Sequence, residues 1–145
     1  MTEIFDNLKL GSQICFPLYA ASKEIVKRYR PYLDDLNLTY TQYITMMALW
    51  EHKRLNVKEL GEKLYLDSGT LTPVLKSLEA KGYVLRTRST RDERVLNVEL
   101  TEEGEALRER ARQVPDEVFG SIRLSTEESK TLYGLLYKLL DGMEG

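Results

Sequence analysis

The sequence predicts a mainly α-helical (α+β) domain with a small β-wing, arranged as a winged helix-turn-helix with helical arms at both ends. Three observations predict this fold. Two short amphipathic helices joined by a tight turn lie between Asn56 and Gly82. Directly afterwards, apolar residues alternate with polar ones on both sides of a charged tip, as in a β-hairpin. Apolar stripes with helical spacing precede and follow this central part.

The first arm is predicted from a stripe with spacings of four, three and four residues, formed by Ile14, Leu18, Ala21 and Ile25. Residues 1–13 are polar. Because proline lacks a backbone N–H, we expect this helix to begin near Pro17 and to end at about Tyr29, before Pro31. A second helix is expected after Thr39–Thr41, carrying Tyr43, Ile44, Met47, Ala48 and Trp50.

The helix-turn-helix is predicted from signals at the helix ends. Asn56 and Glu59 have the spacing of a capping box, which opens a short helix through Leu60 and Leu64. Tyr65–Gly69 interrupts the pattern. Pro73 is tolerated only in a first turn, so the next helix begins near Ser68–Thr72. The apolar face of this helix consists of Leu71, Val74, Leu75 and Leu78. Gly82 is expected to form its left-handed C-terminal cap.

The wing and the second arm follow. Strands are expected at Tyr83–Leu85 and Val95–Leu100, with a polar tip over Arg86–Arg94. Thr101 caps a helix that we expect to run to about Gly120. Ser125 and Glu128 form another capping box. The last helix has a wide apolar face, formed by Leu132, Leu135, Leu136, Leu139, Leu140 and Met143.

Length and composition predict one domain of 145 residues. Within it, the order of the predicted elements places dimerisation arms at about 1–35 and 115–145 and a DNA-binding lobe at about 40–110. A single cysteine excludes an intramolecular disulfide and a Cys-rich zinc site, and favours a reducing compartment. No signal peptide or apolar span is apparent, so we expect a cytoplasmic protein without a membrane segment. With His52 as the sole histidine, no catalytic residue, metal or cofactor is expected.

The charge distribution predicts where double-stranded DNA binds. The net charge is −2, but Lys76–Arg94 holds six cations and three acids, a local +3. These cations lie on the second helix of the helix-turn-helix and on the wing, where the phosphates of DNA would be met. The arginines of the hairpin tip can reach a minor groove. The alternative is that the arginines of the tip are only exposed to solvent and do not contact DNA. The candidate DNA-binding residues are Ser68, Thr70, Thr72, Lys76, Arg86, Arg88, Arg91 and Arg94. Asp92 is expected to hold the wing in shape by pairing with Arg94 or Arg88.

Cys15 is the candidate reactive residue. A lone cysteine is often an inert small apolar residue, and a tyrosine stripe is often plain core packing. Cys15, however, precedes Pro17 near a helix N-terminus, where backbone dipoles favour a thiolate. Phenols that could donate hydrogen bonds to it lie on its helical face and at the start of the next helix, namely Tyr19, Tyr29 and Tyr40.

The spacing of these residues predicts a homodimer. Cys15 and Tyr29 are fourteen residues apart, which is about 21 Å along a straight helix. If both serve one thiol, a second subunit must supply the distant phenols. The wide leucine face of the last helix also requires a partner.

Five separated motifs resemble the MarR family, within its organic-hydroperoxide-responsive repressor branch. These motifs cover nearly the whole chain and comprise Cys15-Phe16-Pro17-Leu18-Tyr19-Ala20, Leu38-Thr39-Tyr40-Thr41-Gln42-Tyr43, Leu49-Trp50-Glu51, Leu66-Asp67-Ser68-Gly69-Thr70-Leu71-Thr72-Pro73 and Asp92-Glu93-Arg94. The resemblance implies that Cys15 is the peroxide sensor and that Tyr29 and Tyr40 contact it from the other subunit. Tyr19 also matches a position in that site. Without a resolving cysteine, the chain is similar to the one-cysteine type.

The leading hypothesis is therefore a homodimeric repressor on a pseudo-palindromic operator, released when an organic hydroperoxide oxidises Cys15 to a sulfenic acid. The sulfenic acid would condense with a low-molecular-weight thiol or with the backbone nitrogen of Phe16. One alternative is a MarR-type repressor that responds to a phenolic or aromatic ligand. A related regulator of general oxidative stress or virulence is another, and a thiol peroxidase is the third.

Overall fold

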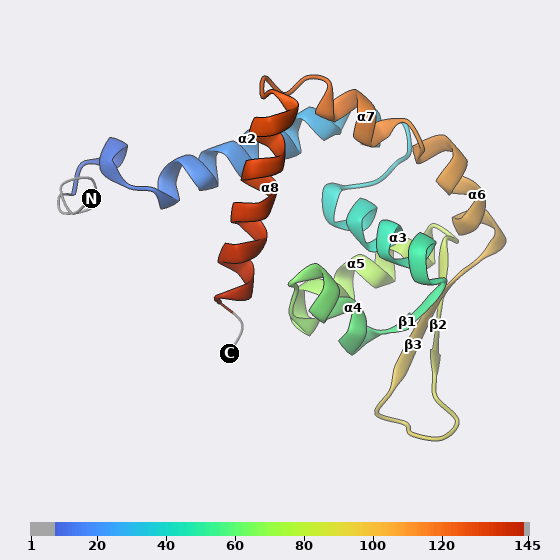
Figure 1. Cartoon of the computed structure of the whole chain (residues 1–145). Helices are drawn as coiled ribbons and strands as arrows, with labels where there is room; N and C mark the ends of the chain where they lie inside the picture. Colours follow the sequence, from blue (N-terminus) through green and yellow to red (C-terminus); the bar gives the residue numbers. More distant parts are fainter. Residues whose placement is uncertain (1–7, 144–145) are drawn as a thin grey trace. The chain divides into compact units, whose positions relative to one another are not determined.

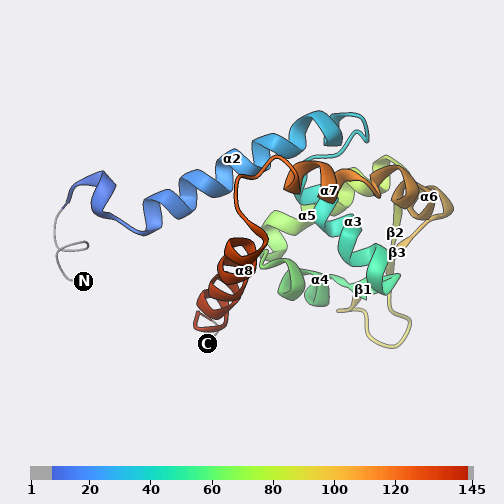
Figure 2. The same ribbon diagram turned by 45° about the horizontal axis from the view of Figure 1, so that its top comes forward.

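The computed structural model describes residues 8–143, which form two compact units. The first unit ends at Val114 and the second begins at Pro115. Figures 1 and 2 show the order of the elements along the chain in each unit. None of the helices in residues 8–143 combines the length and the apolarity that a bilayer span requires.

The first arm is a short 3₁₀ turn, η1 (Leu10–Ser12), followed by the long helix α2 (Cys15–Asp34). The helix begins two residues before Pro17, because the first-turn N–H groups have no partner within the helix and a proline there loses nothing. The expected end at Tyr29 was wrong. Pro31 lies inside α2 and removes one hydrogen bond near its end, while burial of Leu33 holds the last turn in place.

Helix α3 (Tyr40–His52) begins at a capping box, in which Thr39 accepts from the Gln42 N–H and the Gln42 side chain accepts from the Thr39 N–H. A three-residue strand, β1 (Arg54–Asn56), follows and was not predicted. Its three residues are too few to show the alternation of apolar and polar residues that predicts a strand. It forms because Leu55 pairs with Val98 of a later strand.

The predicted helix-turn-helix is α4 (Val57–Leu64) and α5 (Ser68–Ala80). The Asn56–Glu59 capping box opens α4 as expected. Gly82 follows α5 with a φ of +84°, a left-handed conformation that glycine adopts without strain. The apolar face of α5 is buried against the lobe through Leu71, Leu75 and Leu78.

The wing consists of β2 (Val84–Arg88) and β3 (Leu96–Leu100), within a three-stranded antiparallel sheet of order β1-β3-β2. Val84 and Val98 point into the core and are fully buried. The loop between β2 and β3 extends from the lobe in Figure 1.

The single helix expected from Thr101 to Gly120 was wrong, because two helices occupy this stretch: α6 (Glu102–Ala111) and α7 (Val114–Phe119). Pro115 supplies the reason. In a continuous helix it would leave the Ala111 carbonyl without its donor, whereas in the first turn of α7 its missing N–H costs nothing. Trp50 attaches α3 to α6 by donating a buried hydrogen bond of 2.8 Å to the Gly104 carbonyl.

The second unit contains α8 (Thr126–Asp141), which opens with the predicted Ser125–Glu128 capping box. Its apolar side chains are exposed to solvent, including Leu132, Tyr133, Leu135, Tyr137 and Leu139. A helix of this kind buries its apolar face when a partner covers it.

Candidate functional site

Cys15 is exposed and is the first residue of α2. The preceding residue, Ile14, provides no side-chain cap, and the first turn contains no acidic residue. The first-turn N–H groups of an α-helix have no partner within the helix, and Cys15 lies at this end of α2. Because Cys15 is exposed, an oxidant in solution can reach the thiol.

Three tyrosines pack together where the last turns of α2 meet the start of α3. The ring centroids of Tyr29 and Tyr40 are 5.0 Å apart in an edge-to-face arrangement, and those of Tyr29 and Tyr43 are 5.6 Å apart. Tyr29 and Tyr40 were predicted site residues, whereas Tyr43 was predicted as a helix residue and part of a family motif but not as a member of this cluster. The spacing of three between Tyr40 and Tyr43 was the signal that could have identified it.

These phenols are protonated at neutral pH, and burial moves their pKa values further from neutrality. Desolvation raises the pKa of Tyr29 and of Tyr40, and it raises the pKa of Tyr43 to about 12. At neutral pH each hydroxyl is therefore a hydrogen-bond donor, which is the form that can stabilise a thiolate or a sulfenate.

The structure does not bring Cys15 to these tyrosines within one chain. Helix α2 is continuous from Cys15 to Asp34, so the fourteen residues between Cys15 and Tyr29 span about 21 Å. Tyr19 lies one turn after Cys15 and is exposed. The Lys23 ammonium lies 5.2 Å from the centre of the Tyr19 ring.

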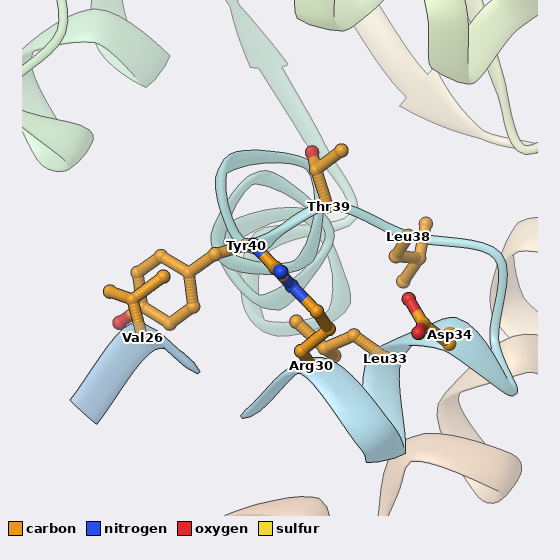
Figure 3. A pocket seen from close by; sticks show the side chains of 7 residues that line it. All are labelled: Val26, Arg30, Leu33, Asp34, Leu38, Thr39 and Tyr40. Carbon is orange, nitrogen blue, oxygen red and sulfur yellow. The ribbon is translucent and has the colours of Figure 1, made fainter. Parts of the chain in front are cut away.

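A small pocket of about 170 Å³ adjoins Tyr40. Figure 3 shows Val26 and Tyr40 at one side of it, with Leu38 and Asp34 at the other. Arg30 and Leu33 of α2 and Thr39 complete the lining. The lining of the pocket joins an aromatic ring and aliphatic side chains with one cation and one anion.

The start of α5 presents hydroxyl groups. The Asp67 carboxylate accepts the Thr70 N–H at 2.7 Å, and this bond holds the Asp67 pKa below its usual range. Ser68 and Thr70 are exposed. Thr72 uses its hydroxyl hydrogen within the helix, because its Oγ1 donates to the Ser68 carbonyl at 2.7 Å. Lys76 is exposed one turn further along the helix.

The tip of the wing is ordered by short-range hydrogen bonds. Asp92 accepts both the backbone N–H and the Nε–H of Arg94 at 3.0 Å, and the pairing with the Arg94 side chain lowers the Asp92 pKa. Arg88 donates instead to the Glu93 carbonyl at 3.2 Å. The Ser89 hydroxyl accepts the N–H of Arg91, whose side chain is exposed at the tip. Of the two partners considered for Asp92, the structure selects Arg94.

Arg86 is the middle residue of β2 and does not lie at the tip of the wing, where it was expected. Its guanidinium donates to Glu79 of α5 with nitrogen–oxygen distances of 2.9 and 3.2 Å, and its backbone N–H donates to the same carboxylate. The Arg86 side chain is mostly buried. The structure therefore separates Arg86 from the other wing arginines and attaches it to the helix-turn-helix.

The described residues, 8–143, contain no cluster of histidine, cysteine and acidic side chains that could hold a metal ion. The chemistry available in the described part is thus that of a thiol beside a helix terminus, a set of protonated phenols, and a surface of hydroxyls and cations.

Comparison with known proteins places the chain among regulators. Residues 23–110 match the family described as transcriptional regulator SarA/Rot. The chain is 50% identical to the organic hydroperoxide resistance transcriptional regulator of Bacillus subtilis over 141 residues, which cover 97% of this chain and 96% of that protein. It is 47% identical to the regulator SarZ of Staphylococcus aureus over 127 residues, covering 88% and 86%.

Solved structures agree with these relatives. The reduced form of AbfR bound to DNA superimposes with a TM-score of 0.76 at 33% identity, covering 92% of this chain and 94% of that one. These relatives are transcriptional regulators and not enzymes. The chain belongs to the MarR family of winged helix-turn-helix transcriptional regulators, in the branch that contains the regulators of organic hydroperoxide resistance.

Proposed function

We propose that the chain is a homodimeric, cytoplasmic repressor that binds DNA while Cys15 is reduced and is released when an organic hydroperoxide oxidises Cys15. The observation that carries this proposal is the exposed thiol at the first position of α2. Identity of 50% along nearly the whole chain with a regulator of organic hydroperoxide resistance supports it.

The DNA-binding surface that we propose consists of the start of α5 and the tip of the wing. Ser68 and Thr70 offer hydroxyls, Lys76 offers a cation, and Thr72 offers its methyl group. The wing contributes Arg88, Arg91 and Arg94, with Asp92 holding the tip in shape. Because Arg86 is paired with Glu79, we assign it to the attachment of the wing rather than to DNA contact.

A second copy of the chain accounts for two features. The apolar side chains of α8 and of the first half of α2 are exposed, and both belong to the arms at about 1–35 and 115–145 that we propose as the dimerisation region. If the phenols serve the Cys15 thiol, the distance of about 21 Å between Cys15 and Tyr29 along α2 means that a second subunit supplies them. We therefore place Cys15 of one subunit beside Tyr29 and Tyr40 of the partner subunit, with Tyr19 near the thiol.

The redox step follows from the thiol chemistry. The Cys15 sulfur attacks the terminal oxygen of the hydroperoxide, the O–O bond breaks, and the alcohol leaves with a proton. Sulfur is oxidised by two electrons to a sulfenic acid. A low-molecular-weight thiol then condenses with it to a mixed disulfide, or the Phe16 nitrogen condenses to a sulfenamide, and either reaction releases water. A new group at the subunit junction shifts the two recognition helices, whose half-sites lie about 34 Å apart.

The test uses a duplex selected by the reduced protein from random-sequence DNA. Cys15→Ser is expected to bind this duplex with wild-type affinity and to stay bound when cumene hydroperoxide is added, as measured by fluorescence anisotropy. A matched control carries Cys15→Ser together with Ser22→Cys, which moves the thiol two turns along the exposed side of α2. This control should also stay bound. Release of Cys15→Ser by the hydroperoxide would overturn the proposal.

The pocket beside Tyr40 supports one second candidate, a repressor that responds to a phenolic or aromatic ligand. In that case Cys15 has no part in induction. A phenolic compound would then release wild-type protein and Cys15→Ser equally, with no change in the mass of either chain.

A further inference from the structure

A buried amide links the start of α3 to the end of α5. The Gln42 side chain is 7% exposed and uses both of its polar atoms. Its oxygen accepts the Thr39 N–H at 3.0 Å and the Lys81 ammonium at 2.9 Å, while its nitrogen donates to the Ser77 hydroxyl at 2.9 Å. One side chain therefore joins the α3 cap to two residues one turn apart on α5.

Lys81 extends this link to the end of α2. It is the residue that caps α5, and its ammonium also donates to the Asn37 carbonyl in the turn between α2 and α3. Asn37 has a φ of +55°, a left-handed conformation that directs this carbonyl away from the helical path. Desolvation lowers the Lys81 pKa, in keeping with an ammonium enclosed among these acceptors.

The position of this network in the fold is informative. Tyr40 is the first residue of α3, two positions before Gln42, and packs against Tyr29 of α2. Ser77 and Lys81 lie at the opposite end of α5 from Ser68, where we propose DNA contact. Figures 1 and 2 both show α3 and α5 lying close together in the lobe.

We propose that the hydrogen bonds of Gln42 with Ser77 and Lys81 are the positioning element through which a displacement of the phenol-bearing start of α3 reaches the recognition helix α5. The inference rests on the proposed function, because it assumes that oxidation of Cys15 moves the tyrosines. None of the three residues touches the thiol or, in our proposal, DNA.

The contacts of α5 predict the direction of the effect. Besides this network, buried leucines hold α5 in the fold, as do the hydrogen bonds that Arg86 of β2 donates to Glu79. When the network is cut, these contacts keep α5 in its DNA-binding orientation even if the start of α3 shifts. Loss of the network is therefore expected to uncouple release from oxidation rather than to weaken binding by the reduced protein.

Lys81→Met, which keeps the aliphatic stem, and Ser77→Ala are the test variants. The chain offers a matched control in Arg110→Met, because Arg110 of α6 donates at 2.7 Å to the Asp35 carbonyl of the same turn but does not reach α5. Lys81→Arg, which keeps the charge and the donors, is the conservative rescue. The readouts are the rate of Cys15 sulfenate formation and the dissociation constants for the selected duplex before and after oxidation.

Wild type, Arg110→Met and Lys81→Arg should show the same ratio of oxidised to reduced dissociation constants. In Lys81→Met and Ser77→Ala this ratio should fall at least fivefold, while Cys15 oxidises at the wild-type rate. A ratio equal to that of wild type in both variants would overturn the inference. If wild type itself is not released by hydroperoxide, the proposed function fails. If wild type is released and both variants show the wild-type ratio, only the inference fails.

Hydrogen exchange provides a readout that needs no DNA. Oxidation should change amide exchange in the first turn of α3 and in α5 of the wild type. In Lys81→Met the change in α3 should persist and that in α5 should disappear. Persistence of the α5 change would also overturn the inference.

Discussion

The Glu79 carboxylate on α5 accepts three hydrogen bonds from Arg86 on β2, two from the guanidinium and one from the backbone N–H. These bonds fix the middle of β2 to the recognition helix. The two proposed parts of the DNA-binding surface are the start of α5 and the wing tip. The Glu79–Arg86 bonds connect the elements that bear them. The pair attaches the wing to α5 even though neither residue is at the tip.

The first prediction concerns the pH dependence of this pair. Hydrogen bonds from Arg86 lower the Glu79 pKa below its ordinary value of about 4.5. A carboxylate whose pKa is lower in the folded state stabilises the fold above about pH 4.5, and this contribution is lost as the pH falls through the folded pKa. Glu79→Gln should therefore lower the free energy of unfolding at pH 7, with a difference from wild type that shrinks at pH 3.

Urea unfolding at the two pH values measures this difference. The control is Glu127→Gln, which removes a carboxylate that faces Lys130 at 3.9 Å on the exposed surface of α8. An exposed pair of this kind contributes little to stability. The control should match wild type at both pH values, and a difference for Glu79→Gln that is constant with pH would contradict the prediction.

The second prediction separates the two kinds of wing arginine. Each phosphate contact adds about one unit to the slope of log K against log salt concentration. Arg94→Ala should weaken DNA binding and reduce the slope by roughly two per dimer, one for each subunit. Arg86→Met should lower thermal stability but leave the slope unchanged, because the Glu79 pair and not a phosphate holds Arg86. Equal slope changes for both variants would refute this division.

Arg86 illustrates how far sequence reasoning extends. The capping boxes at Asn56 and Ser125, the glycine after α5 and the alternation in the wing were all readable, because each signal lies within a few neighbouring residues. The pairing of Arg86 with Glu79 spans seven residues across a turn. From the sequence, Arg86 could not be distinguished from the arginines of the tip, which are solvent-exposed.

The hydrogen bonds of Gln42 were also beyond prediction from local sequence patterns. Its bonds to Ser77 and Lys81 join residues 35 and 39 positions apart, and no local pattern specifies them. The strand β1 was missed for a similar reason, since pairing with β3 defines it and its own three residues do not. By contrast, the long helix between Cys15 and Tyr29 was predicted well enough to exclude their meeting within one chain.

The third prediction concerns the packing that supports the lobe. A Cβ at Gly104 would lie 2.1 Å from the Tyr83 carbonyl oxygen, which is backbone and cannot turn aside. Gly104→Ala should therefore destabilise the protein by about 3 kcal/mol or more, despite the better helix propensity of alanine. Chemical denaturation measures the effect. Gly134→Ala in α8, where a Cβ meets nothing within 4 Å, should instead be neutral or stabilising by up to about 1 kcal/mol.

The last prediction tests whether the phenols act across the dimer. Tyr29→Phe and Tyr40→Phe each remove one hydroxyl and keep the ring packing. Loss of a hydrogen bond to a charged acceptor costs about 1.5 to 3 kcal/mol, so the thiolate should become less stable. In homodimers that carry both substitutions, alkylation of Cys15 at neutral pH should slow by at least tenfold.

A mixed dimer shows which subunit supplies the phenols. One subunit carries Cys15→Ser and keeps its tyrosines, while the other keeps Cys15 and carries Tyr29→Phe and Tyr40→Phe. Two different affinity tags allow the mixed dimer to be purified. Because α2 separates Cys15 from Tyr29 by about 21 Å within one chain, the remaining thiol should meet the intact phenols of the other subunit and alkylate at the wild-type rate. A rate as slow as that of the doubly substituted homodimer would place the phenols and the thiol in the same chain.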